Sequence, residues 1–116
     1  MTTEGDARRV ADMVEMLADI RDRMRAGWIA FSGDATQQKA VAYDLMVLGE
    51  AASKVSRRTQ AANPKVPWTT VVEYRNELIH EYGHLDLKAT WEFVIQKLPG
   101  LERDLRRVRA IPSPDE

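Results

Sequence analysis

Apolar residues recur every three or four positions along most of this chain, the spacing that places them on one face of an α-helix. No segment shows the alternating pattern of a half-buried strand. The sequence therefore predicts an all-α fold whose first element is one long helix over residues 6–28. The apolar positions of this helix are Val10, Met13, Val14, Leu17, Ile20 and Met24.

Two breaks in the periodicity set the expected boundaries of the next helices. The first break contains Ser32 and Asp34, either of which can cap free backbone amides, so a second helix is expected from about Ala35. The second break is the segment 63–68, whose two prolines disfavour helical dihedrals. A third helix is therefore expected over residues 68–80.

The second predicted helix is expected to be central and buried on more than one side, because apolar residues cover two strips of its surface. Gly49 lies within it, and glycine inside a helix costs about 1 kcal/mol relative to alanine. The position is therefore expected to admit the close approach of another segment. One strip comprises Val41, Leu45, Leu48, Ala52 and Val55, and the other comprises Tyr43, Met46 and Val47.

The last helical segment follows Asp86, which is suited to cap it, and Pro99 is expected to kink or split it. These elements predict an up-and-down bundle of four to five helices that forms one domain over residues 1–116. The ordered core is expected to span about residues 6–110, with a frayed tail at 111–116.

The composition limits which partners the chain can bind by charge alone. Its 17 Lys and Arg residues are balanced by 18 Asp and Glu residues, so a nucleic acid would have to bind at a local basic patch. Cysteine is absent, which excludes disulfides, thiolate nucleophiles and cysteine metal ligands. Neither a signal-peptide pattern nor a membrane-spanning apolar run is present, and a soluble, cytoplasmic protein is expected.

The end of the third predicted helix concentrates groups that bind phosphate and move protons. On a helix, Asn76 and His80 lie one turn apart on the same face, and Arg75 and Tyr82 are also close in angle if the helix continues that far. A histidine can exchange a proton with the 2'-hydroxyl or the leaving oxygen of RNA, and an arginine can stabilise charge on phosphate. These four side chains are candidates for one catalytic pocket, and no metal or other cofactor is expected.

The same residues also have non-catalytic explanations. A histidine near a helix end often contacts terminal carbonyls, and Arg75 could pair with Glu73 or Glu77 at the surface. His84 could join a metal site, but no third ligand of recognisable spacing is present. The basic run at residues 103–109 could guide RNA, although a solvated helical face is the simpler explanation. Spacing alone leaves these alternatives open.

The order and spacing of the four candidate residues resemble the signature of the HEPN superfamily. That signature is an arginine, four residues, a histidine, one residue and a tyrosine, often with asparagine directly after the arginine. The likeness extends from the first helix to about residue 109, and the chain thereby resembles the HepT-like toxins of this superfamily. Its further elements are Gly49-Glu50-Ala51, Pro67-Trp68, Trp91 and Leu98-Pro99.

The resemblance implies a HEPN-like bundle and a metal-independent endoribonuclease that cleaves RNA through the 2'-hydroxyl. Arg75 and His80 would be the central catalytic pair, with Asn76 and Tyr82 supporting the site. Glu50, on the preceding helix, would orient the arginine or the histidine. Two protomers would bring their motifs together across the cleft of a homodimer, beside one RNA strand.

The resemblance also implies that the chain is the toxin of a type II/VII-like toxin–antitoxin pair. Its antitoxin would be a minimal nucleotidyltransferase that silences the toxin by attaching AMP to Tyr82. The added phosphate would compete with RNA phosphate for Arg75 and fill space above the site. The chain departs from many relatives at Glu81, where they have glycine, and this acid would repel RNA beside the site.

Two other functions are compatible with the same features. A helical protein without catalytic activity could use this surface to bind a nucleotidyltransferase or a nucleotide. The chain could also be the substrate-binding subunit of a two-chain nucleotidyltransferase. Toxicity on expression without a neighbouring nucleotidyltransferase would favour the toxin.

Overall fold

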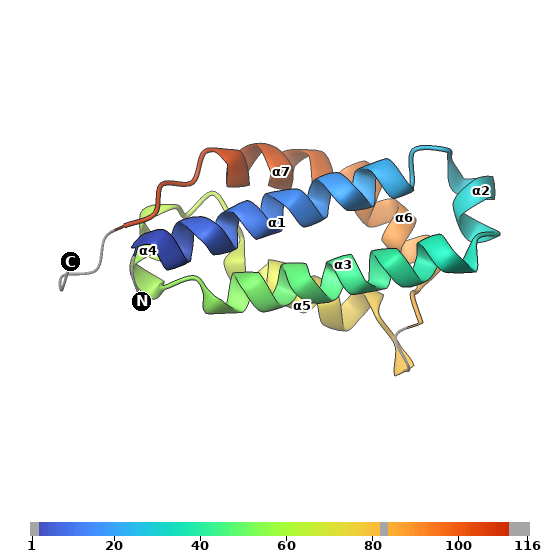
Figure 1. Ribbon diagram of the computed structural model, residues 1–116, viewed down its shortest axis with the longest axis horizontal. Helices are drawn as coiled ribbons and strands as arrows, with labels where there is room; N and C mark the ends of the chain where they lie inside the picture. Colours follow the sequence, from blue (N-terminus) through green and yellow to red (C-terminus); the bar gives the residue numbers. More distant parts are fainter. Residues whose placement is uncertain (1–2, 82–83, 112–116) are drawn as a thin grey trace.

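Two long helices, α1 (Thr3–Arg23) and α3 (Ala35–Lys54), lie side by side and antiparallel along the length of the molecule (Figure 1). The computed structural model describes residues 3–81 and 84–111, and these residues form seven helices. The described part of the chain has principal extents of 50 × 26 × 18 Å, so the two long helices define its long axis.

Three further helices complete the bundle around this pair. α5 (Trp68–Leu78) lies against α3, α7 (Leu98–Arg106) lies against α1, and α6 (Leu87–Gln96) contacts both α5 and α7. The two remaining helices are short, since α2 (Trp28–Ser32) has five residues and α4 (Arg57–Ala62) has six. The predicted all-α bundle is confirmed, and the two short helices account for the larger number of elements. No helix within the described ranges is long and apolar enough to cross a membrane.

The predicted caps lie where the sequence placed them, but the first predicted break does not, because Ser32 belongs to α2. Asp34 and Asp86 cap α3 and α6, each accepting a hydrogen bond from the backbone amide three residues later. The last helical segment is split at Lys97, two residues before Pro99, which lies in the first turn of α7. A proline there loses no helical hydrogen bond, because the first amides of a helix have no partner within it.

Two expectations about helix boundaries are wrong. The first helix ends at Arg23 rather than near residue 28, because Gly27 adopts a φ of 102° that a right-handed helix does not contain. The chain after α3 contains an additional helix, α4, which was not predicted. Ser56 caps it by accepting a hydrogen bond from Thr59 N at 3.3 Å. That serine was a recognisable signal for a helix start.

The expected central position of α3 is confirmed by its packing against both α1 and α5, but the expected burial of its second apolar strip is wrong. Tyr43 is 64% exposed and Met46 is 50% exposed. One face of α3 therefore remains uncovered in the single chain. The opposite strip, Val41, Leu45, Leu48, Ala52 and Val55, is buried as predicted.

The core lies where the apolar stripes of the long helices meet those of α5 and α7. Removing such side chains from water contributes roughly 1.5–3 kcal/mol for each fully buried large aliphatic residue. The predicted apolar stripe of α1 supplies several of these residues, which confirms that this face of α1 points into the core. The largest fully buried apolar side chains are Met13, Leu17, Ile20, Leu45, Leu48, Leu98, Leu105, Val41 and Val71.

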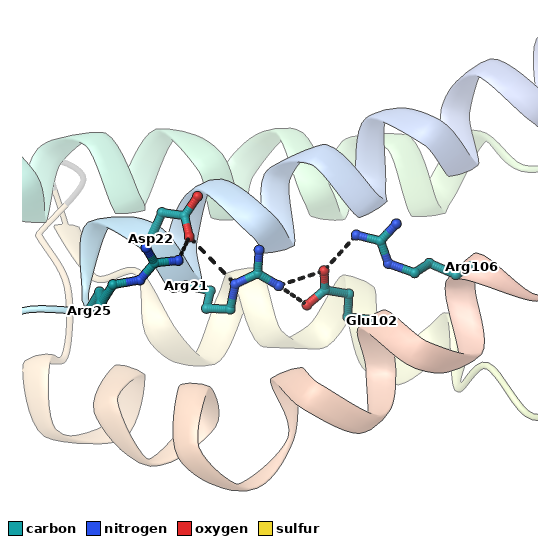
Figure 2. A network of polar contacts seen from close by, with 5 residues as sticks. All are labelled: Arg21, Asp22, Arg25, Glu102 and Arg106. Atoms are coloured by element: carbon teal, nitrogen blue, oxygen red, sulfur yellow. Dashed lines mark hydrogen bonds and ion pairs between the residues drawn. The ribbon is translucent and has the colours of Figure 1, made fainter.

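A nearly buried glutamate fastens α7 to α1. Arg21 donates to both carboxylate oxygens of Glu102, at 2.7 and 2.8 Å, and Arg106 donates to one of them at 2.9 Å (Figure 2). Burial by itself would raise the pKa of Glu102, but the hydrogen bonds from Arg106 and Arg21 lower it below its ordinary value. Part of the basic run at residues 103–109 is thus used for packing.

A second buried carboxylate, Asp6, joins the start of α1 to α4. Asp6 is 1% exposed and accepts hydrogen bonds from Ser56 N (3.0 Å), Ser56 Oγ (2.5 Å) and Thr59 Oγ1 (2.5 Å). Burial raises the pKa of Asp6, but the hydrogen bonds from Ser56 and Thr59 outweigh this effect and lower it. Thr59 Oγ1 also accepts from Ile111 N at 3.0 Å, whereas residues 112–116 of the expected frayed tail lie outside the described residues.

Asp6→Asn is expected to lower the free energy of unfolding by about 1–3 kcal/mol, because an amide cannot accept all three hydrogen bonds. Since the pKa of Asp6 is lowered in the folded protein, its stabilisation is present above the unfolded pKa and is lost as pH falls through the folded pKa. Urea unfolding of both proteins should therefore show a larger difference near neutral pH than in strong acid.

Glu15→Gln is the control, because Glu15 is an exposed acid on the same helix. Its free energy of unfolding should change by no more than about 0.5 kcal/mol. Equal unfolding curves for the wild-type protein and Asp6→Asn would contradict the assigned role of Asp6.

Candidate functional site

α5 ends at Leu78, two residues earlier than predicted, so the candidate histidine lies outside the helix. Ile79 has extended backbone, with φ −107° and ψ 121°, and forms an antiparallel bridge with Leu85. The amide of Asp86 donates to the carbonyl of Leu78 at 2.9 Å. Residues 79–81 therefore project from the bundle beyond α5, and residues 84–86 return to it before α6 begins (Figure 1); these residues are called the projecting segment.

The expectation that Asn76 and His80 share one helical face is consequently wrong. Asn76 remains in the last turn of α5 with an exposed side chain, whereas His80 lies in the projecting segment. The same termination removes the helical argument that placed Tyr82 beside Arg75. Tyr82 itself lies outside the described residues.

Arg75 crosses α3 at Gly49, the glycine for which a close approach was predicted. A Cβ atom at residue 49 would lie 3.1 Å from Arg75 Cβ and 3.2 Å from Arg75 Cδ. These distances are shorter than ordinary van der Waals contacts between carbon atoms. The absence of a side chain at Gly49 thus lets the stem of Arg75 lie directly on the backbone of α3.

The head of Arg75 lies near Glu50, the residue expected to orient it. Arg75 Nη1 is 3.8 Å from Glu50 Oε2, and the other carboxylate oxygen of Glu50 is 2.8 Å from Lys54 Nζ. The hydrogen bond from Lys54 lowers the pKa of Glu50 most, and the charges of Arg75 and Arg9 lower it further. One carboxylate thus pairs with basic side chains from α3 and α5 and is also affected by the charge of a basic side chain from α1.

His80 faces a different acid. Its Nε2 atom is 3.7 Å from Asp86 Oδ2, and the two side chains are 59% and 42% exposed. The backbone hydrogen bond from Ala89 lowers the pKa of Asp86 most, and the contact with His80 lowers it further. Within the described ranges, no group of three His, Asp or Glu side chains is placed to hold a metal ion.

The structure thus places the predicted site residues in two separate groups. Glu50 and Arg75 are brought together across α3 and α5, and His80 is held by Asp86 at the base of the projecting segment. Asn76 is exposed beside the first group, one residue from Arg75.

Sequence reasoning missed three residues that act on the predicted ones, two by direct contact and one by charge. Lys54 follows Glu50 by four residues on α3, a spacing that could have identified the pair. Asp86 was predicted only as a helix cap, and nothing local connects it with His80. Arg9 comes from α1, far away in sequence, so no local signal places it near Glu50.

The chain has recognisable relatives among known proteins. A family model described as Ribonuclease HepT-like matches residues 13–108. A candidate RNase of Methanocaldococcus jannaschii is 31% identical over 107 residues, which cover 90% of this chain and 88% of the relative. A candidate ribonuclease HepT of Thermococcus cleftensis is 29% identical over 79 residues, covering 68% and 72%. No solved structure matches the chain significantly.

Gly49→Ala is expected not to give the usual gain of about 1 kcal/mol for replacing glycine in a helix, because its Cβ displaces Arg75. Gly100→Ala is the matched control. A Cβ at residue 100 meets Arg103 Nη2 at 3.6 Å, an ordinary contact, so this change should stabilise by about 0.5–1 kcal/mol. Urea unfolding measures both, and equal gains would show that Arg75 does not need the glycine.

Proposed function

Because the chain belongs to the ribonuclease HepT-like family, we propose that it is an endoribonuclease that cleaves RNA through the 2'-hydroxyl without a metal ion. Family membership and the expected enzyme class, a ribonuclease, are confirmed by the match over residues 13–108. The reaction, its residues and its regulation are inferences from the site.

The observation that carries the proposal is that the two central motif side chains are held at the surface rather than used in the core. Arg75 is 32% exposed and His80 is 59% exposed, and each lies within 4 Å of its own carboxylate. An arginine with a purely structural role would be buried and could not reach a phosphate. A histidine that only contacted the terminal carbonyls of a helix would lie against that helix and would not project from the bundle. Both side chains remain accessible to a strand of RNA.

The proposed reaction is an internal transfer at phosphorus. The 2'-oxygen attacks the adjacent phosphorus, the bond to the 5'-oxygen breaks, and the products carry a 2',3'-cyclic phosphate and a 5'-hydroxyl. His80 accepts the proton of the 2'-hydroxyl, and the imidazolium so formed, or a water molecule, gives a proton to the leaving 5'-oxygen. Arg75 stabilises the charge that develops on the other phosphate oxygens. Asn76 and Tyr82 are proposed to support this site.

A local basic patch supports RNA binding by a chain whose formal net charge is −1. Lys54 and Arg75 lie within 4 Å of Glu50, and the charge of Arg9 also acts on this carboxylate, so positive charge exceeds negative charge beside the proposed phosphate site. Arg9 Nε is buried and has no hydrogen-bond partner within the described part of the chain. Such a cluster can bind the RNA backbone without a protein-wide basic field.

We propose further that the active form is a homodimer that pairs through the uncovered face of α3. Tyr43 and Met46 are 64% and 50% exposed on this face, and Glu50 lies one turn beyond Met46 on the same side. A two-fold contact requires only one such self-complementary surface. Burying the apolar pair in a second copy would bring the two Arg75 regions near each other.

Tyr43→Asp and Met46→Asp are each expected to weaken the dimer about tenfold or more, because each places a charge in an apolar contact. Sedimentation equilibrium measures the dissociation constant, and RNA cleavage should fall in parallel. Ile95→Asp is the control, because Ile95 is 59% exposed on α6 and away from this face. A monomeric wild-type protein, or a dimer that both α3 variants retain, would contradict the proposed interface.

The proposed regulation involves a minimal nucleotidyltransferase antitoxin that attaches AMP to Tyr82, with the chain acting as a toxin in the cytoplasm. Two features support it. Tyr82 follows His80 by two residues, so a modification there lies close to the proposed site. An AMP group two residues from His80 would also bring a negative phosphate to this segment, where it would repel the RNA backbone.

The central test is cleavage of a mixed RNA pool by the purified, unmodified protein in EDTA. His80→Ala should lower the rate by about 100-fold or more, through loss of proton transfer. Arg75→Ala should lower it by roughly 100- to 1000-fold, through loss of charge stabilisation. His84→Ala is the matched control, because His84 is exposed in the same segment and its side chain is not needed for the reaction.

Circular dichroism and sedimentation should show that all variants fold and associate like the wild-type protein. If the wild-type protein cleaves no RNA, the nuclease proposal fails and the chain is better explained as a binding partner. Cleavage that survives in both His80→Ala and Arg75→Ala would show that another site performs the reaction.

A further inference from the structure

We propose that Asp86 is a positioning residue for His80, whose carboxylate orients the imidazole ring during RNA cleavage. This inference rests on the proposed ribonuclease function. Asp86 is not part of the sequence motif; it is the residue that directly precedes α6.

The carboxylate of Asp86 is held in a fixed position by the start of α6. Its Oδ1 atom accepts a hydrogen bond from Ala89 N at 3.0 Å. The other oxygen, Oδ2, faces His80 Nε2 at 3.7 Å. One oxygen of Asp86 thus caps the helix and the other faces the histidine. The cap therefore determines on which side of the imidazole ring the carboxylate lies.

The backbone holds the two residues in register with each other. His80 N donates to the carbonyl of His84 at 2.6 Å, and Asp86 N donates to the carbonyl of Leu78 at 2.9 Å. These two hydrogen bonds form the antiparallel bridge of Ile79 with Leu85. The backbones of His80 and Asp86 therefore stay on opposite sides of one bridge unless these hydrogen bonds break.

The charges around the pair favour an ionised Asp86 beside the ring. The backbone hydrogen bond from Ala89 is the main cause that lowers the pKa of Asp86, and His80 and Lys88 lower it further. A carboxylate that remains ionised attracts the imidazolium formed when the ring accepts a proton. In this arrangement Nε2 faces the acid at 3.7 Å, and Nδ1 is left for RNA.

Asp86→Asn tests the role without removing the cap, because asparagine caps helices about as well as aspartate. The melting temperature should stay the same, KM should change little, and kcat should fall about tenfold, as part of the contribution of the histidine is lost. Asp34→Asn is the matched control. It makes the same change at the cap of α3, where no histidine is present, and should leave kcat unchanged.

A second measurement reports the contact without using activity. The carboxyl carbon signal of Asp86 in nuclear magnetic resonance should titrate at a higher pH in His80→Ala than in the wild-type protein, because one cause that lowers the pKa of Asp86 is gone. His84→Ala should leave the titration of Asp86 where it is in the wild-type protein.

The two measurements separate the possible failures. An Asp86→Asn protein with wild-type kcat, or an Asp86 titration that His80→Ala does not move, overturns the positioning role even if the wild-type protein cleaves RNA. A wild-type protein that cleaves no RNA, with an Asp86 titration that His80→Ala still moves, overturns the nuclease proposal and with it the catalytic role of Asp86. A selective loss of kcat together with the moved titration supports the inference.

Discussion

The contact of α1 with α3 is the interaction on which every other element depends. Met13, Leu17 and Ile20 from one helix are fully buried with Leu45 and Leu48 from the other. Helices as short as α5, α6 and α7 are marginal by themselves in water. α5 and α7 persist because they bury apolar faces against this pair, and α6 packs in turn against α5 and α7. The apolar surface that α1 and α3 leave uncovered therefore determines where the shorter helices lie, and with them the position of the site.

Acidic side chains divide into structural and surface roles within this frame. Asp6 and Glu102 are buried and carry several hydrogen bonds each, and Asp44 is buried against Arg23 Nε at 2.9 Å. They fasten α1 to α4, α7 and α3, respectively. Glu50 and Asp86 are instead partly exposed and lie beside the two central motif side chains. The proposed chemistry thus uses acids that the core does not need.

The sequence predicted well those features that depend on a few neighbouring residues. The caps at Asp34 and Asp86, the split before Pro99 and the buried stripe of α1 follow from hydrogen bonding and side-chain spacing within one or two turns. The requirement for glycine at position 49 could also be stated from helix propensity, although not the identity of its partner. The end of α5 was misplaced, because its termination depends on the pairing of Ile79 with Leu85.

The sequence by itself determined the helical class, the caps and the order of motif residues that identifies the family, because periodicity, capping and spacing are written along the chain. Only the tertiary structure decided which groups meet. It brought Arg75 onto Gly49 beside Glu50, placed His80 against Asp86 and left Tyr43 and Met46 uncovered. The physical reason is that these contacts join segments whose relative position is fixed by burial of the shared core, and no local pattern encodes that position.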